Sequence, residues 1–167
     1  MKKFDKKIQI KIIKIILIVI WMAIVFGFSN QKGAESSNTS RKVTVAVVET
    51  FSDKNIEENE PLIEKIETII RKLAHYSIYT VGGFLIMNYA YAMNKSTNEK
   101  ILWSVVFGAG YAVTDELHQF FVSNRSARLF DVGIDTLGVL TGVFVYLILR
   151  KVIKFIEIKV KEIKLQV

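Results

Sequence analysis

The sequence predicts an all-α protein of the polytopic membrane class, built as a four-transmembrane-helix bundle with an extracellular amphipathic-helical loop. Two observations support this fold class. Hydrophobic residues make up 51% of the 167 residues and the mean hydropathy is +0.32, although 23% of the residues are charged. The apolar and charged residues are also segregated into blocks, which is typical of a membrane protein.

The composition excludes several other classes of protein. The formal net charge is +7, but its segregation between apolar blocks argues against a nucleic-acid-binding protein or a disordered tail. The chain contains no Cys, which excludes disulfides, iron–sulfur clusters, thiolate zinc sites and cysteine nucleophiles. A single Pro in the whole chain argues against a loop-rich all-β protein.

We expect one domain, residues 1–167, with four membrane spans at about residues 10–28, 73–93, 101–122 and 130–149. The first uncharged block, 15–28, is short for a span of about 20 residues. Lys11 and Lys14 can extend it because their ammonium groups can reach the headgroup surface. A cleaved signal peptide is the alternative, with a lysine-rich start and a cleavage site near Ser29.

The other three spans have short connections, which favours an up-down bundle. The second contains no formal charge besides His75, the third is uncharged up to Thr114, and the fourth is interrupted only by two aspartates. Gly138 and Gly142 form a G-x-x-x-G pair in the fourth span, a pattern that lets helices approach closely in lipid.

The long segment 29–72 forms the predicted extracellular loop. Residues 61–71 place a proline in a first helical turn and repeat apolar residues at helical spacing. We expect an amphipathic helix here that lies on the outer surface and continues into the second span. Residues 41–51 fit either a second surface helix or a strand.

Lysine counting predicts the orientation. Residues 1–14 hold six Lys, residues 150–167 hold one Arg and five Lys, and residues 94–100 hold two Lys. With four spans, all three segments lie on one side, and basic residues accumulate on the cytoplasmic side of membranes. We therefore expect a multi-pass protein with both termini in the cytoplasm.

Ionisable residues collect at the opposite, outer ends of the spans. Together with the polar Gln119, they open the second span, close the third, and begin the fourth: Arg71, Lys72, His75, Asp115, Glu116, His118, Gln119, Arg125, Arg128, Asp131 and Asp135. A carboxylate in hydrocarbon costs roughly 2.5–3.5 kcal/mol even on a lenient scale, so these groups must face the bundle interior and meet cations. Such a paired cluster is by default a functional-site hypothesis.

Other interpretations of the cluster stay open. Arg–Asp pairs could simply hold the helices together. A divalent-metal site from His75, His118, Asp115, Glu116 or Asp135 has no H-E-x-x-H or comparable spacing behind it, so we predict neither a metal nor a cofactor. Ser123 and Ser126 lack the G-x-S-x-G context of a serine hydrolase.

Several motifs in the chain resemble those of VanZ-like bacterial membrane proteins. Residues 71–76 resemble the family's R-K-x-A-H-[FY] opening, with Tyr79 following, and residues 111–119 are similar to its Y-A-x-x-D-E-x-x-Q signature. Residues 28–31 look like its F-S-x-Q, and Arg125-Ser126 with the later Asp131 and Gly138 resembles its R-S…D…G tail. Departures from the pattern occur at Ile78, at Ser123-Asn124 and at Asp135, where relatives often carry an acid, Pro-Gly and Asn.

The resemblance implies a protein of the bacterial cytoplasmic membrane that is linked to low-level resistance to teicoplanin-type glycopeptides. Together with the spacing it defines the expected ligand-binding cluster: Arg71, Lys72, His75, Tyr79, Asp115, Glu116, Gln119, Arg125, Asp131 and Asp135.

Two functions are compatible with this cluster. In the first, it binds the headgroup of a membrane lipid, of a lipid-linked cell-wall precursor or of a lipoglycopeptide, in resistance or envelope homeostasis. In the second, the protein is a membrane-embedded hydrolase or transferase that acts on a lipid-linked envelope substrate, with His75, Glu116 or Asp115 as the candidate catalytic residues. We expect no nucleic-acid partner, and the number of copies in an assembly stays open.

Overall fold

The computed structural model describes residues 6–30, 38, 40–46, 60–122 and 128–165. Its principal helices are α1 (Lys6–Ser29), α3 (Glu60–Ala90), α4 (Thr97–Phe120) and α5 (Leu129–Leu165). Residues 40–46 form a further short helix. The described residues contain no strand, which confirms the all-α prediction.

Two of these helices, α1 and α5, are long and apolar enough to cross a membrane. Most apolar side chains on α1 face outward, and those of Val19 and Phe28 are 56% and 54% exposed, as expected for a helix in contact with lipid. In contrast, α3 carries polar residues such as His75 and Asn88 along its length, and α4 carries Asp115 and Glu116 near its end. These residues lower the hydropathy of both helices, so their passage across the membrane remains a prediction.

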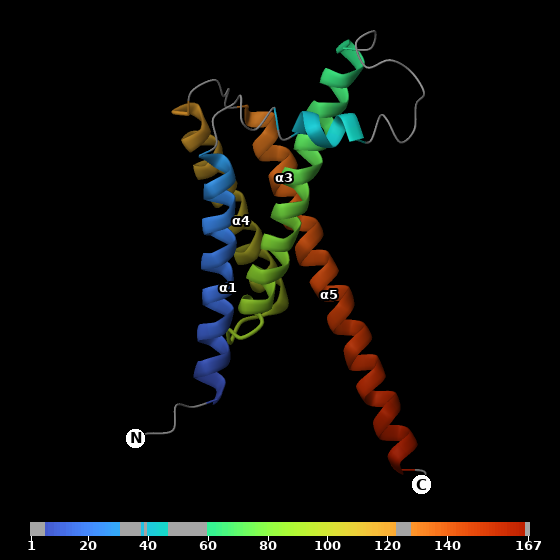
Figure 1. Cartoon of the computed structure of the whole chain (residues 1–167). Helices are drawn as coiled ribbons and strands as arrows, with labels where there is room; N and C mark the ends of the chain where they lie inside the picture. Colours follow the sequence, from blue (N-terminus) through green and yellow to red (C-terminus); the bar gives the residue numbers. More distant parts are fainter. Residues whose placement is uncertain (1–5, 31–37, 39, 47–59, 123–127, 166–167) are drawn as a thin grey trace.

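The helices alternate in direction along the chain. Trp21 donates from its indole nitrogen to the carbonyl of Ile78 (2.8 Å), and Lys14 donates from its ammonium group to the carbonyl of Asn88 (2.8 Å), so α1 and α3 are antiparallel. The Tyr111 hydroxyl donates to the carbonyl of Met22 (2.6 Å). Both ends of the chain lie at the same end of the bundle (Figure 1).

The core is formed around Trp21, which is 3% exposed. Its ring meets Tyr79 edge to face, with centroids 5.7 Å apart, and lies tilted against Tyr111 at 5.2 Å. Aromatic pairs in these geometries add about 0.5–1.5 kcal/mol beyond the burial of their area. Trp21 thus joins α1 to both α3 and α4.

Glycines bring α3 and α5 into close contact. A Cβ atom at Gly138 or Gly142 of α5 would collide with the carbonyl oxygen of Tyr76 or Thr80, and a Cβ at Gly83 of α3 would collide with the carbonyl of Val139. The G-x-x-x-G pair therefore packs directly on the backbone of a neighbouring helix, as its pattern indicated. This contact fixes the register of the two helices.

The predicted helix at residues 61–71 is present and continues into the second predicted span as one helix, α3, as expected. Residues 41–46 are helical, so the helix was the correct alternative there, while residues 47–51 lie outside the described part. Arg41 donates to both carboxylate oxygens of Glu60 (2.7 and 2.9 Å) and ties the short helix to the start of α3. These hydrogen bonds hold the pKa of Glu60 below its usual value and raise that of Arg41.

The start of α4 follows a local sequence signal. Ser96 caps α4 in a capping box: its hydroxyl accepts from the Glu99 amide (3.3 Å), and the Glu99 carboxylate accepts from the Ser96 amide (2.8 Å).

The last helix, α5, continues well beyond Leu149, where the fourth predicted span ends, and reaches about 55 Å in length, longer than a bilayer core. Its last part carries alternating Lys and apolar residues and extends away from α1 (Figure 1).

Candidate functional site

The helices place ionisable and polar side chains in one layer at the end of the bundle where α1 and α4 finish and α5 begins. We call this the polar layer and define it by its described members: Lys72, His75, Tyr79, Asp115, Glu116, Gln119, Asp131 and Asp135. It combines side chains from α3, α4 and α5. The packing of α3 on α5 through their glycines fixes the depth at which these side chains meet.

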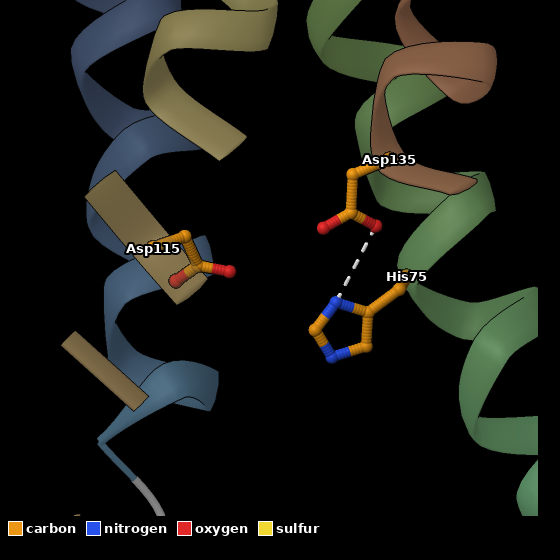
Figure 2. Close-up of side chains that lie close together, drawn as sticks. All are labelled: His75, Asp115 and Asp135. Carbon is orange, nitrogen blue, oxygen red and sulfur yellow. Dashed lines mark ion pairs between the residues drawn. The ribbon is translucent and has the colours of Figure 1, made fainter. Parts of the chain in front are cut away.

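The centre of the layer contains one histidine and two aspartates from three different helices. His75 Nδ1 lies 3.6 Å from Asp135 Oδ1, and the Asp115 carboxylate approaches the pair from α4 (Figure 2). One ligand atom from each of the three residues lies within 4.8 Å of the other two. Asp135 is 1% exposed and Asp115 is 5% exposed, so both carboxylates are buried.

Hydrogen bonds from its own helix, α4, and from the end of α1 position Asp115. Gln119, four residues later, donates from its side-chain amide to Asp115 Oδ2 (3.2 Å), as their shared helix face indicated. The Ser29 hydroxyl, at the end of α1, donates to the Asp115 backbone carbonyl (3.5 Å). Tyr79 packs in the same region and is fully buried.

A second group of charges lies at the more exposed edge of the layer. Lys72 Nζ lies 3.4 Å from Asp131 Oδ1, and both side chains are 27% exposed. The Lys72 ammonium also lies 4.5 Å from the centre of the Phe130 ring. Glu116, which is buried, accepts a hydrogen bond from the backbone amide of Arg128, so a backbone donor and not a guanidinium satisfies this carboxylate.

Five of the residues considered from the sequence are placed differently or lie outside the described part. Arg71 is exposed and forms no ion pair within the described ranges. Arg125 lies outside the described residues, as do Ser123 and Ser126. His118 stacks on Phe26 with ring centroids 4.7 Å apart and takes no part in the central group of three.

The polar layer retains polar atoms whose hydrogen-bonding capacity is unused. Both carboxylate oxygens of Asp135, together with the Tyr79 hydroxyl, are buried and have no hydrogen-bond partner among the described residues. His75 Nδ1 lies 3.6 Å from Asp135 Oδ1, which is longer than a hydrogen bond. Burying a carboxylate without full compensation is costly, so this centre is suited to hold a cation or a proton or to orient a catalytic imidazole.

The sequence did not indicate the contact of Ser29, the Arg41–Glu60 pair, or that Arg128 would meet a carboxylate through its backbone amide. A polar residue that ends the first apolar block at the depth of the layer would have been a signal for Ser29. The other two contacts have no local signal, because Arg128 acts through its backbone amide and Arg41 and Glu60 are far apart in the chain.

A family model described as VanZ/LLP1 matches residues 14–150, which cover all of the polar layer. No curated protein and no solved structure matches the chain. The match agrees with the motif resemblance at residues 71–79 and 111–119, and with the membrane character of α1 and α5. Because the model covers well over half of the sequence, the chain belongs to the VanZ/LLP1 family.

Proposed function

We propose that all four principal helices cross the bacterial cytoplasmic membrane and that both termini are cytoplasmic. The alternating helix directions and the location of both chain ends at one end of the bundle support this topology (Figure 1). The described parts of the three basic segments, residues 6–14, 94–100 and 150–165, lie towards that same end (Figure 1). The polar layer then faces the outer leaflet.

In this orientation the polar layer binds an anionic or zwitterionic headgroup of a lipid or a lipid-linked cell-wall precursor. Lys72 is partly exposed at the rim of the layer, beside the exposed Arg71, where both cations can donate to a phosphate or carboxylate. Asp131 holds the Lys72 ammonium in place at the rim. The observation that carries the proposal is this convergence of charged side chains from three helices at one depth.

Headgroup binding of this kind connects the chain to low-level resistance to teicoplanin-type glycopeptides or to envelope homeostasis. Membership of the VanZ/LLP1 family supports the link to resistance. A protein that binds lipid headgroups or a drug's lipid anchor at the outer leaflet changes how much drug reaches its target there.

The test is the minimum inhibitory concentration of teicoplanin in a sensitive Gram-positive host. The host expresses wild type, Glu116→Gln, Lys72→Gln or the control Glu157→Gln, with membrane protein levels compared by blot. We expect wild type and Glu157→Gln to raise the inhibitory concentration, and Glu116→Gln and Lys72→Gln to lose the increase at equal abundance. No increase with wild type would contradict the resistance function.

A direct binding measurement complements the resistance assay. Purified protein in detergent is offered phosphatidylglycerol and analysed by native mass spectrometry. We expect bound lipid that survives detergent activation in wild type and falls several-fold in Lys72→Gln but not in Glu157→Gln. Equal retention in all three proteins would exclude headgroup binding at the rim.

A second candidate function is an enzyme that acts on a lipid-linked envelope substrate. The observation that favours it is the His75–Asp135 pair, because a buried carboxylate beside an imidazole is the arrangement that orients a general base. Charge-preserving variants separate the two functions. If Asp115→Glu and Glu116→Asp abolish the increase in the inhibitory concentration while the fold persists, catalysis is favoured. If both variants keep the increase, headgroup binding is favoured.

A further inference from the structure

We propose that His75, Asp115 and Asp135 form a binding site for one divalent transition-metal ion. The site lies at the centre of the polar layer and uses one side chain from each of α3, α4 and α5 (Figure 2). It is independent of headgroup binding at the rim, and it changes the sequence-based expectation that no metal is bound.

The spacing of the three side chains fits coordination better than hydrogen bonding. The 3.6 Å between His75 Nδ1 and Asp135 Oδ1 is too long for a hydrogen bond. Two ligand atoms that each lie about 2.1 Å from one tetrahedral ion are about 3.4 Å apart, close to this distance. The Asp115 oxygen lies within 4.8 Å of the other two atoms, so small side-chain movements bring all three to one ion.

The helices that carry the ligands are held together by contacts outside the site. Gly138 and Gly142 seat α5 on the backbone of α3 one to two turns from Asp135. On the other side, Gln119 donates to one oxygen of Asp115 and leaves the second oxygen available to face the pair. The ligands are therefore positioned before any ion binds.

Charge supports the same conclusion. The Lys72 ammonium pairs with Asp131, and Arg128 contacts Glu116 only through its backbone amide. Two buried carboxylates, Asp115 and Asp135, thus face a single imidazole, and both oxygens of Asp135 lack a hydrogen bond from any described residue. Two carboxylates and a neutral imidazole around a dication sum to zero charge, which removes most of the cost of burying them.

The ligand set indicates the class of metal. One imidazole with two carboxylates suits Mn²⁺, Fe²⁺ or Zn²⁺ better than Ca²⁺, which prefers six to eight oxygen ligands. Three protein ligands also leave coordination positions open for water or for an oxygen of a bound molecule. The buried Tyr79 hydroxyl lies in the same part of the layer and can donate to such a group.

The test is calorimetric titration of Zn²⁺ and Mn²⁺ into the full chain, purified in detergent without a polyhistidine tag and stripped with a chelator. The chain has only two histidines, so His118→Gln is the matched control for His75→Gln. Glu157→Gln, in the exposed last part of α5, is the matched control for Asp135→Asn. We expect one ion per wild-type chain, binding at least about tenfold weaker in His75→Gln and Asp135→Asn, and control affinities within about twofold of wild type.

Thermal unfolding of the same samples guards against variants that fail to fold. We expect the metal to raise the melting temperature of wild type and His118→Gln, and to leave that of Asp135→Asn unchanged. Titrations in which wild type binds no more tightly than Asp135→Asn would overturn the proposal and leave a shared proton as the compensation at this centre. Equal losses in His118→Gln and His75→Gln would also overturn it, because the ion would then sit elsewhere.

Discussion

The polar layer and the glycine-lined contact between α3 and α5 are adjacent in the bundle but differ in how well their groups are packed and hydrogen-bonded. At the glycine contact, backbones touch, and the Tyr76 hydroxyl and Thr141 share a hydrogen bond of 2.7 Å. In the polar layer, Asp135 sits one turn away with both oxygens lacking hydrogen bonds from the described residues. The difference teaches that close packing supplies the stability of this bundle, while the layer keeps an unfavourable arrangement that folding alone does not require.

The largest effect on stability is expected from a substitution at the glycine-lined contact between α3 and α5. Gly142→Ala places a Cβ against the Thr80 carbonyl and the Phe84 amide, so α3 and α5 must separate. We expect the free energy of unfolding in detergent to fall by about 2–3 kcal/mol. Gly110→Ala is the control, because a Cβ there meets no atom within 4 Å. Equal stability of the two variants would show that the α3–α5 contact is not the main source of stability.

The core around Trp21 tests whether packing elsewhere also stabilises the bundle. Trp21→Phe removes the hydrogen bond to the Ile78 carbonyl and part of the ring contact with Tyr79. We expect a loss of about 1–2 kcal/mol in the free energy of unfolding. Trp103→Phe should change it little, because the side chain of Trp103 is 56% exposed. The comparison is made by denaturant titration monitored by circular dichroism.

A substitution in the polar layer should not lower the free energy of unfolding, in contrast to those in the packed regions. Asp135→Asn removes a buried charge whose two oxygens lack hydrogen bonds from the described residues. Without added metal we therefore expect the free energy of unfolding to stay the same or to rise by about 1 kcal/mol. Melting curves in chelator measure this against wild type. A marked loss of stability would mean that the His75–Asp135 pair holds the bundle together and is not maintained for function.

The smallest effect concerns the Arg41–Glu60 pair, which lies outside both regions. Because Arg41 lowers the pKa of Glu60 in the folded state, the pair stabilises the fold above the unfolded pKa of Glu60 and loses this contribution as the pH falls through the lowered value. We expect faster hydrogen exchange in residues 40–46 at pH 3 than at pH 7, beyond the intrinsic pH effect. In Arg41→Gln this extra pH dependence should be absent.

Much of the fold followed from local patterns. The apolar blocks placed α1 and the first part of α5, and the glycine spacing at Gly138 and Gly142 indicated a close helix contact. The i, i+4 spacing also predicted that Asp115 and Gln119 share a face, and the two side chains are hydrogen-bonded. The helix at residues 61–71 and its continuation into the second span were also predicted. The continuation of α5 beyond Leu149 was not predicted, because Lys residues interrupt the apolar pattern there.

The sequence by itself therefore determined the all-α class and where the principal helices lie, which end of the bundle collects charge, and which family the chain resembles. Only the tertiary structure decided which charges meet: His75 pairs with Asp135, Lys72 with Asp131, and Asp115 is left facing the first pair without a cation from the described residues. The physical reason is that each such contact joins two helices. It depends on their rotation and relative depth, which are set by packing between distant segments and not by spacing along one of them.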